Sequence, residues 1–172
     1  QKTDGLSYNK IFSALQNGYI EFTVGTYHTD ATSIDGFGTV RESLTRGESV
    51  RLDDQNNTMR TGSYTTLSAN NVYGYLTAQE TIGESYNKIW NGTSYVEYTV
   101  GRYTTDATSI DGFGTVRTAI TLGNSVRLDD QNLEMRTGSY TTESYNNVYG
   151  YLTAQKTDGL SYNKIFSALQ NG

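Results

Sequence analysis

The chain has 172 residues, a net charge of −5 and only 18% charged residues, and it contains neither cysteine nor proline. This composition is too aromatic and too weakly charged for a disordered chain, and disulfides cannot stabilise it. Acidic residues outnumber the scattered basic ones, which argues against nucleic acid and anionic membranes as partners. No apolar run approaches the roughly 18 residues of a membrane span, so no membrane insertion is expected.

The chain is a tandem duplication. Gln1–Gly18 recurs letter for letter as Gln155–Gly172, and a related stretch, QETIGESYNKIWNG, begins at Gln79. These landmarks predict a first β repeat over residues 1–78, a second over 79–154 and the start of a third copy over 155–172. We expect this last segment to complete or extend a sheet. Since no proline- or serine-rich linker separates the copies, we expect them to pack closely.

The residue types favour strands and turns. Tyrosine (15) and threonine are typical of strands, whereas glycine (18) and asparagine supply turns. The sequence therefore predicts an all-β fold of two tandem, closely packed antiparallel β-rich repeats. Each repeat is expected to be a sandwich or small barrel-like unit of about six short strands.

The first predicted elements lie where the two copies differ in length. SALQNGYIEF in the first copy faces the shorter NGTSYVEY in the second, and length changes concentrate in loops. The Asn17-Gly18 pair in this stretch is typical of a tight hairpin turn. Ile20, Phe22 and Val24 then alternate with polar residues, which predicts a half-buried strand.

Two further turns are predicted from glycines. Gly36 and Gly38 mark the first, in a block that is identical in the two copies, and Arg46-Gly47 marks the centre of a second hairpin. Similar strand sequences follow one another along the chain, which indicates a meander of adjacent antiparallel strands.

The end of each copy is predicted to contain two more strands. The polar loop Asp53–Asn56 precedes a strand over Met59–Thr66. The last predicted strand covers Asn70–Ala78, where Tyr73 and Tyr75 would share one face because side chains alternate.

Catalysis is poorly supported. The only histidine, His28, corresponds to Thr104 in the second copy, so a catalytic base would be missing from one repeat. The chain has no cysteine, no GxSxG elbow and no glycine-rich phosphate loop in a strand-to-helix context. We expect no enzymatic activity.

The acidic loops allow two interpretations. Carboxylate and amide oxygens are the ligands that calcium prefers, and the same residue types hydrogen-bond to their own backbone in tight turns. Calcium is therefore the one cofactor that the sequence leaves open. The candidate ligands are Asp53, Asp54, Asn56, Asp129, Asp130 and Asn132.

The repeated lysines suggest a cross-link as a further alternative. Lys10, Lys88 and Lys164 lie in the recurring SYNKI, beside an asparagine and with Glu21 or Glu97 as nearby carboxylates. An isopeptide bond between lysine and asparagine would fit these residues. A lysine on an edge strand, where its charge discourages unwanted pairing, is the simpler explanation.

Two functional hypotheses follow. The first is a structural or adhesive module of a secreted, repetitive surface or extracellular-matrix protein, which associates with itself head-to-tail or with array neighbours. Its terminal strands would each lack one neighbour, and an unpaired strand edge is a template for another chain. The assembly residues are Ser7, Tyr8, Lys10, Ile11, Ser161, Tyr162, Lys164 and Ile165.

The second hypothesis is a lectin-like protein that binds polysaccharide through one tyrosine-lined site per repeat. Aromatic rings beside planar polar groups suit sugar binding, although exposed tyrosines on a sheet also pack across strands. The candidate residues are Tyr64, Tyr73, Tyr75, Tyr140, Tyr149 and Tyr151.

Overall fold

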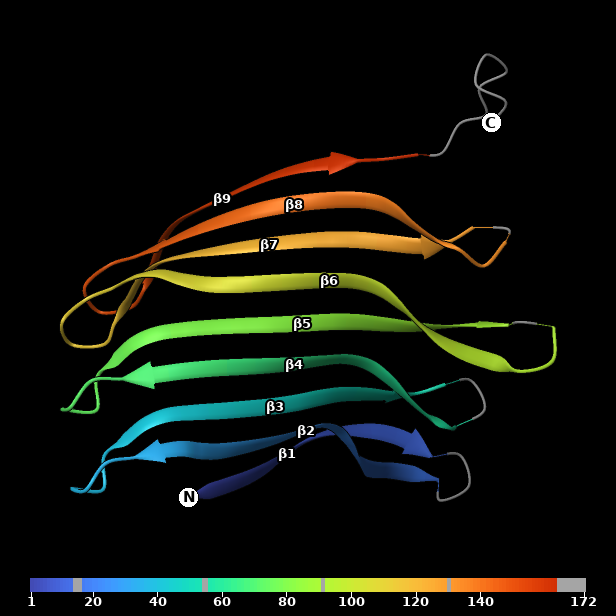
Figure 1. The fold of residues 1–172 in the computed structure, drawn as a ribbon. Coiled ribbons are helices and arrows are strands. Elements are labelled where there is room, and N and C mark those ends of the chain that lie inside the picture. The colour runs from blue at the N-terminus through green and yellow to red at the C-terminus, as the bar shows by residue number, and fades with distance from the viewer. Residues whose placement is uncertain (14–16, 54–55, 91, 130, 164–172) are drawn as a thin grey trace, which may run out of the picture.

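The computed structural model describes residues 1–13, 17–53, 56–90, 92–129 and 131–163. Nine strands in these residues form one open antiparallel sheet, and their spatial order is their order in the chain (Figure 1). The strands are β1 (Lys2–Ser13), β2 (Gly18–Ile34), β3 (Val40–Leu52), β4 (Thr58–Asn70), β5 (Leu76–Trp90), β6 (Tyr95–Ile110), β7 (Val116–Leu128), β8 (Glu134–Asn146) and β9 (Leu152–Ser161). The part of the chain that is described contains no helix that could span a membrane.

The all-β prediction and the meander are confirmed. Every strand pairs with its neighbours in sequence, so the two copies are joined by ordinary strand pairing between β4 and β5. β5 runs from Leu76 to Trp90 and crosses the sequence boundary at Gln79 without interruption. The boundary between the sequence repeats therefore falls inside a strand and not between two structural units.

The sandwich or small barrel-like arrangement is not confirmed, and the count of about six short strands per repeat is wrong. The described residues form one open sheet, with four long strands to each sequence repeat. The predicted turn at Arg46-Gly47 lies in the middle of β3, because Gly47 is opposite Tyr64 and leaves room for its ring. A glycine interpreted as a turn signal is thus a packing position.

The strand predicted over Asn70–Ala78 is also wrong. Residues 71–75 form the turn between β4 and β5, in which Gly74 has a φ of 82°. The side chain of Asn71 accepts hydrogen bonds from two backbone amides of the turn, which outweighs the strand preference of Val72, Tyr73 and Tyr75.

Four β-bulges lie in a line across the sheet. The register shifts after Ser7 in β1, Ser49 in β3, Ser85 in β5 and Ser125 in β7. An extra residue on the partner strand increases the local twist. Figure 1 shows the strands bending as they approach the turns that follow β1, β3, β5 and β7.

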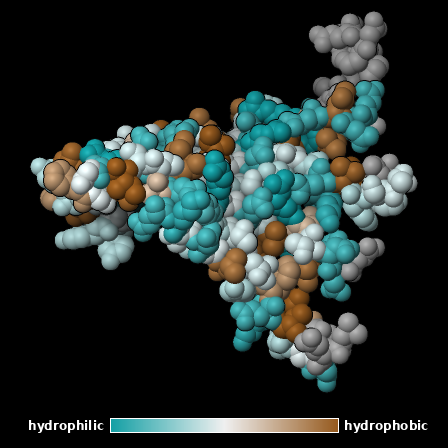
Figure 2. All heavy atoms as spheres, turned by 60° about the horizontal axis from the view of Figure 1, so that its bottom comes forward, coloured by the Kyte–Doolittle hydropathy of each residue, from teal (hydrophilic) through white to brown (hydrophobic). Residues whose placement is uncertain are grey.

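The sheet has almost no core. Met59 and Val126 are the only apolar side chains that are buried among the described residues. Figure 2 shows apolar residues in separate patches with hydrophilic residues between them. Stability must therefore come largely from contacts between side chains on adjacent strands, each of which contributes roughly 0.2–1 kcal/mol.

Candidate functional site

One face of the sheet carries a row in which glycine and tyrosine alternate. In the strand register each glycine of an odd-numbered strand lies opposite a tyrosine on every even-numbered strand beside it, without a break from β1 to β9. The row is Gly5, Tyr27, Gly47, Tyr64, Gly83, Tyr103, Gly123, Tyr140 and Gly159. We call it the Tyr–Gly row.

Each tyrosine ring in this row lies over a glycine of the preceding strand. A Cβ atom built on Gly83 would lie 2.2 Å from Cζ of Tyr103, and one on Gly47 would lie 2.4 Å from Cζ of Tyr64. Such a distance is far inside van der Waals contact, so only glycine leaves room for the ring in this position. The tyrosines remain partly exposed on their other side; Tyr64, for example, is 36% exposed.

Two parallel rows flank the Tyr–Gly row on the same face. Two residues away in one direction, every strand has threonine, and pairs such as Thr66 and Thr81 share a hydroxyl hydrogen bond of 2.8 Å. In the other direction serine alternates with glycine, as in Ser49 opposite Gly62. Within these three rows the neighbouring side chains are small, and the tyrosine rings are the largest groups.

The opposite face is charged. The Arg60 guanidinium donates to Glu48 at 3.1 Å and to Glu97 at 2.6 Å, and it lies 4.1 Å from the ring centroid of Tyr86. In the second copy Arg102 holds Glu134 through two hydrogen bonds of 2.7 and 2.9 Å. These bonds raise the pKa of both arginines. The bonds to Glu97 and Glu134 link β4 to β6 and β6 to β8, which are not adjacent strands, and so they help to fix the register.

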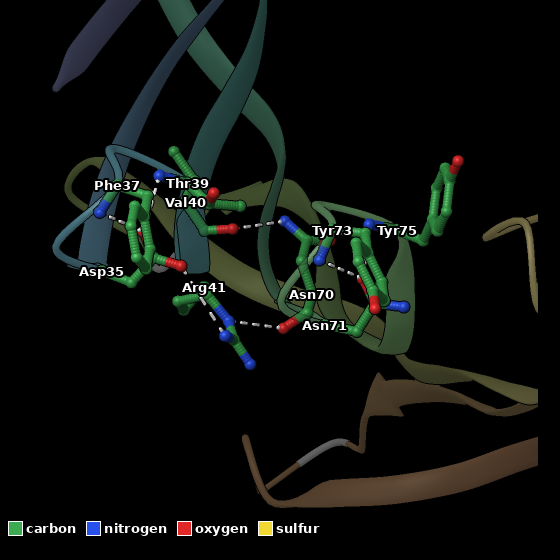
Figure 3. Close-up of polar contacts among 9 residues, drawn as sticks. All are labelled: Asp35, Phe37, Thr39, Val40, Arg41, Asn70, Asn71, Tyr73 and Tyr75. Atoms are coloured by element: carbon green, nitrogen blue, oxygen red, sulfur yellow. Dashed lines mark hydrogen bonds and ion pairs between the residues drawn. The ribbon is translucent and has the colours of Figure 1, made fainter.

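The turns that follow β2, β4, β6 and β8 lie along one edge of the sheet, at the ends of the strands, and they share a single geometry. In the turn between β2 and β3, Oδ1 of Asp35 accepts hydrogen bonds of 3.0 Å from the backbone N–H groups of Phe37 and Thr39 (Figure 3). These amide donors hold the pKa of Asp35 below its ordinary value. Gly38 then takes a φ of 85°, a conformation that glycine adopts without steric strain.

The same arrangement recurs in the next three turns of this edge. Asp111 occupies the position of Asp35, and Asn71 and Asn147 accept the two hydrogen bonds through their amide oxygens. Arg41 links neighbouring turns, because its Nε donates to the backbone oxygen of Asn70 at 3.0 Å (Figure 3). The turns are therefore rigid and evenly placed.

This edge exposes aromatic side chains at every turn, and the turns after β4 and β8 each expose a second one, Tyr75 and Tyr151. The third residue of each turn is Phe37, Tyr73, Phe113 or Tyr149, and their exposed fractions are 99%, 79%, 81% and 80%. Tyr75 connects two of the turns, since its ring centroid lies 6.4 Å from that of Phe113. We call these four residues the aromatic turn edge.

The structure separates the six tyrosines predicted to bind sugar into two sets. Tyr64 and Tyr140 belong to the Tyr–Gly row, whereas Tyr73, Tyr75, Tyr149 and Tyr151 lie in or beside turns of the aromatic turn edge. No single site per repeat unites them. Tyr27 and Tyr103 share the environment of Tyr64 but were not among the predicted residues. The signal for them in the sequence is the pattern Gly-x-Tyr-x-Thr, which residues 25–29 and 101–105 share with residues 62–66.

A shallow groove follows the Ser–Gly row beside the tyrosine rings. Its lining includes Ser49, Gly62 and Ser85 as a low floor, with Tyr64 and Tyr103 along the side. Hydroxyl groups and ring edges are thus presented together along several strands.

The candidate calcium ligands act as turn residues. Asp53 accepts a hydrogen bond of 2.8 Å from the Asn57 amide, and Asp129 accepts bonds of 2.9 Å from the amides of Gln131 and Leu133. Asn56 and Asn132 have φ angles of 61° and 59°, as the fourth residues of these turns. Asp54 and Asp130 lie outside the described residues. Among the residues that are described, no three histidine, aspartate or glutamate side chains gather to hold a metal.

His28 lies beside two carboxylates at the β1–β2 edge. Its Nδ1 contacts Asp4, and its Nε2 lies 3.0 Å from Asp30. The hydrogen bond with Asp4, together with the charge of Asp30, raises the pKa of His28. Because both ring nitrogens are engaged by carboxylates, neither is directed at a nucleophile.

Of the repeated lysines, Lys88 forms an ion pair and Lys10 lies opposite an acid in the strand register. Lys88 is opposite Glu97 in the sheet, and its Nζ lies 3.3 Å from Oδ2 of Asp53, whereas Glu97 is held by Arg60. Lys10 is opposite Glu21 in the equivalent hairpin. Lys164 lies outside the described residues, and the cross-link stays a prediction.

The predicted assembly residues lie in the two edge strands. Ser7, Tyr8, Lys10 and Ile11 belong to β1, which pairs only with β2, and Ser161 ends β9, which pairs only with β8. Tyr162 continues this pairing, since its amide donates to the Thr137 carbonyl at 2.8 Å. Lys164 and Ile165 are outside the described residues.

The first and last strands therefore each keep one side without a neighbouring strand in the described sheet.

Compared with protein-family models, curated proteins and solved structures, the chain matches none of them.

Proposed function

We propose that the chain is a structural or adhesive module of a secreted, repetitive surface or extracellular-matrix protein. One observation carries the proposal: the same rows of side chains cross all nine strands and continue to both edges of the sheet. Such a sheet can be lengthened by further strands without a new kind of contact. It offers extended, regular surfaces rather than one enclosed site.

The arrangement of polar groups supports a passive role. His28 is engaged by two carboxylates, and the acidic loop residues are used as turn acceptors. The three rows on the Tyr-bearing face contain no charged side chain, and so they offer no attraction for nucleic acid. A location outside the cell or at its surface belongs to the same proposal.

The assembly state of the unmodified chain tests this function. Light scattering and electron microscopy across a concentration series should reveal association into extended particles. A chain that stays monomeric at millimolar concentration, and that adheres to no surface or matrix polymer, would contradict the proposal.

Binding of a linear polysaccharide is the second candidate, and the Tyr–Gly row favours it. Its tyrosines recur on every second strand, which spaces them roughly 9.5 Å apart. Threonine and serine hydroxyls flank the rings on both sides. A polymer lying across the strands would meet a ring and hydroxyl groups at regular intervals.

Two sets of variants distinguish the possible sugar-binding surfaces. Replacing Tyr64 and Tyr140 by leucine removes rings from the row, whereas replacing Tyr73 and Tyr149 by alanine removes them from the aromatic turn edge. Loss of retention on a polysaccharide column in the first set alone would place the polymer on the sheet face. Absence of retention by the unmodified chain would exclude this function.

A further inference from the structure

The two edge strands carry the same sequence, because Gln155–Gly172 repeats Gln1–Gly18. β1 uses one of its sides to pair with β2, and β9 uses the other side to pair with β8. β5 is a strand of the same kind and uses both sides at once, since Gly83 is opposite Tyr64 on β4 and Tyr103 on β6. The free side of β9 is thus the side with which β1 binds β2.

Two complete chains placed side by side, here called two copies, would not continue this pattern. In an antiparallel meander all odd-numbered strands run in the same direction, so β1 of a second copy placed beside β9 would form a parallel pair. Two identical strands would then meet, and no tyrosine would face Gly159. The rows that cross the sheet would end at this junction.

We propose that β9 of one copy replaces β1 of a second copy and pairs with its β2. The register follows from the β1–β2 pairing, in which Gly5 is opposite Tyr27. Gly159 would therefore lie under Tyr27 of the second copy, and the shared strand would have the same neighbours as β5. This deepens the proposed structural function, because it names the partner and the surface by which the module associates.

Charge complementarity supports the same register. In the single chain Lys2 lies 3.6 Å from Asp30, and Asp4 contacts His28. Lys156 and Asp158 are the corresponding residues of β9 and can make the same two ion pairs with the β2 strand of a second copy. In the single chain Nζ of Lys156 lies 2.6 Å from Oδ2 of Asp158.

The exchange competes with the chain's own β1. Because only four residues separate the end of β1 at Ser13 from the start of β2 at Gly18, the effective concentration of β1 at β2 is on the order of millimolar. The exchanged form should therefore accumulate when β1 is weakened. Each chain has one donor strand and one acceptor strand, so the contact is head-to-tail, and successive exchanges extend the sheet into an open filament wherever the rotation between chains does not close a ring.

Glycine substitutions in the full-length chain separate donor from acceptor. Gly5→Val weakens the chain's own β1, since a Cβ on Gly5 would lie 2.0 Å from the ring of Tyr27. Gly159→Val blocks the donor by the same clash in the exchanged state. In the single chain the same Cβ meets no ring: its nearest atom, the Ser139 oxygen, lies 3.3 Å away, so a shift of a few tenths of an ångström accommodates it.

The assay is sedimentation velocity over a concentration series, with circular dichroism as the check on folding. Gly5→Val should lower the concentration of half-assembly by about tenfold or more. The double variant Gly5→Val with Gly159→Val should stay monomeric. A Gly5→Val chain that remains monomeric, or a double variant that assembles equally well, would overturn the exchange.

A disulfide test reports the register directly, because the natural chain contains no cysteine. Full-length chains in the Gly5→Val background are made with Asp158→Cys or with His28→Cys and are mixed under oxidation. The exchange predicts a covalent heterodimer, whereas Asp158→Cys mixed with Thr26→Cys should form little of it. If the unmodified chain self-associates but these variants do not follow the pattern, the exchange fails and the structural function stands.

Discussion

The packing of the Tyr–Gly row predicts that one glycine substitution lowers stability when the tyrosine ring is present and raises it when the ring is absent. In the natural chain, Gly83→Ala places a Cβ 2.2 Å from Cζ and 2.4 Å from Cε1 of Tyr103. The ring must leave its position, and overpacking of this kind lowers the free energy of unfolding by about 1–3 kcal/mol. In a chain that already carries Tyr103→Ala, no ring is present. The same Gly83→Ala change should then raise stability by roughly 0.5–1 kcal/mol, because alanine loses less backbone entropy than glycine.

The assay is urea unfolding of the four chains of this double-mutant cycle, followed by circular dichroism. The coupling energy between positions 83 and 103 is expected to be about 1.5–4 kcal/mol. Gly101→Ala is the matched control, since the nearest atom to its Cβ, the Asn124 oxygen, lies 3.4 Å away. If Gly83→Ala has the same effect with and without the Tyr103 ring, the packing explanation of the row is wrong.

Four further outcomes are expected. Asp111→Ala should lower the melting temperature, whereas Asp111→Asn should preserve it because asparagine accepts the same amides in two other turns. The raised pKa of His28 means that its stabilisation of β1 is complete below about pH 6.5 and is lost as the pH rises through that raised pKa. Amide-exchange protection of β1 should fall accordingly, and His28→Thr should abolish this pH dependence. Because Asp129 is used as a turn acceptor, calcium should leave the melting temperature unchanged; an increase that a chelator reverses would restore the calcium site. Since Lys88 is paired with Asp53, the intact mass should equal that of the plain sequence; a deficit of about 17 Da would reveal a cross-link.

The sequence was sufficient to predict strands, a meander and several turns, because these depend on local residue preferences. It failed at Gly47, where the same residue type serves packing instead of a turn. The difference is visible only when the register is known, since the partner Tyr64 lies in another strand. The turn at residues 71–75 could have been predicted better. NVYGY shares its fourth-position glycine with DGFGT at residues 35–39, and both begin with Asn or Asp and have an aromatic third residue.

The candidate surfaces were harder to predict than the fold. Tyr64 and Tyr73 look equivalent in the sequence, yet one lies flat on a sheet and the other extends from a turn. Rows that cross nine strands are assembled from residues spaced irregularly along the chain. Their regularity exists only after the bulges and turn lengths have set the pairing.

The even number of strands in each sequence repeat has a consequence for how such chains can change over generations. Because neighbouring strands are antiparallel, the strand that follows four others runs in the same direction as the first of them. β1, β5 and β9 therefore have the same orientation in the sheet. Gain or loss of a whole repeat by recombination would therefore preserve every pairing on either side of the junction. A population of genes could vary freely in repeat number, and each product would still fold, strand by strand, into one continuous sheet with the same two edges.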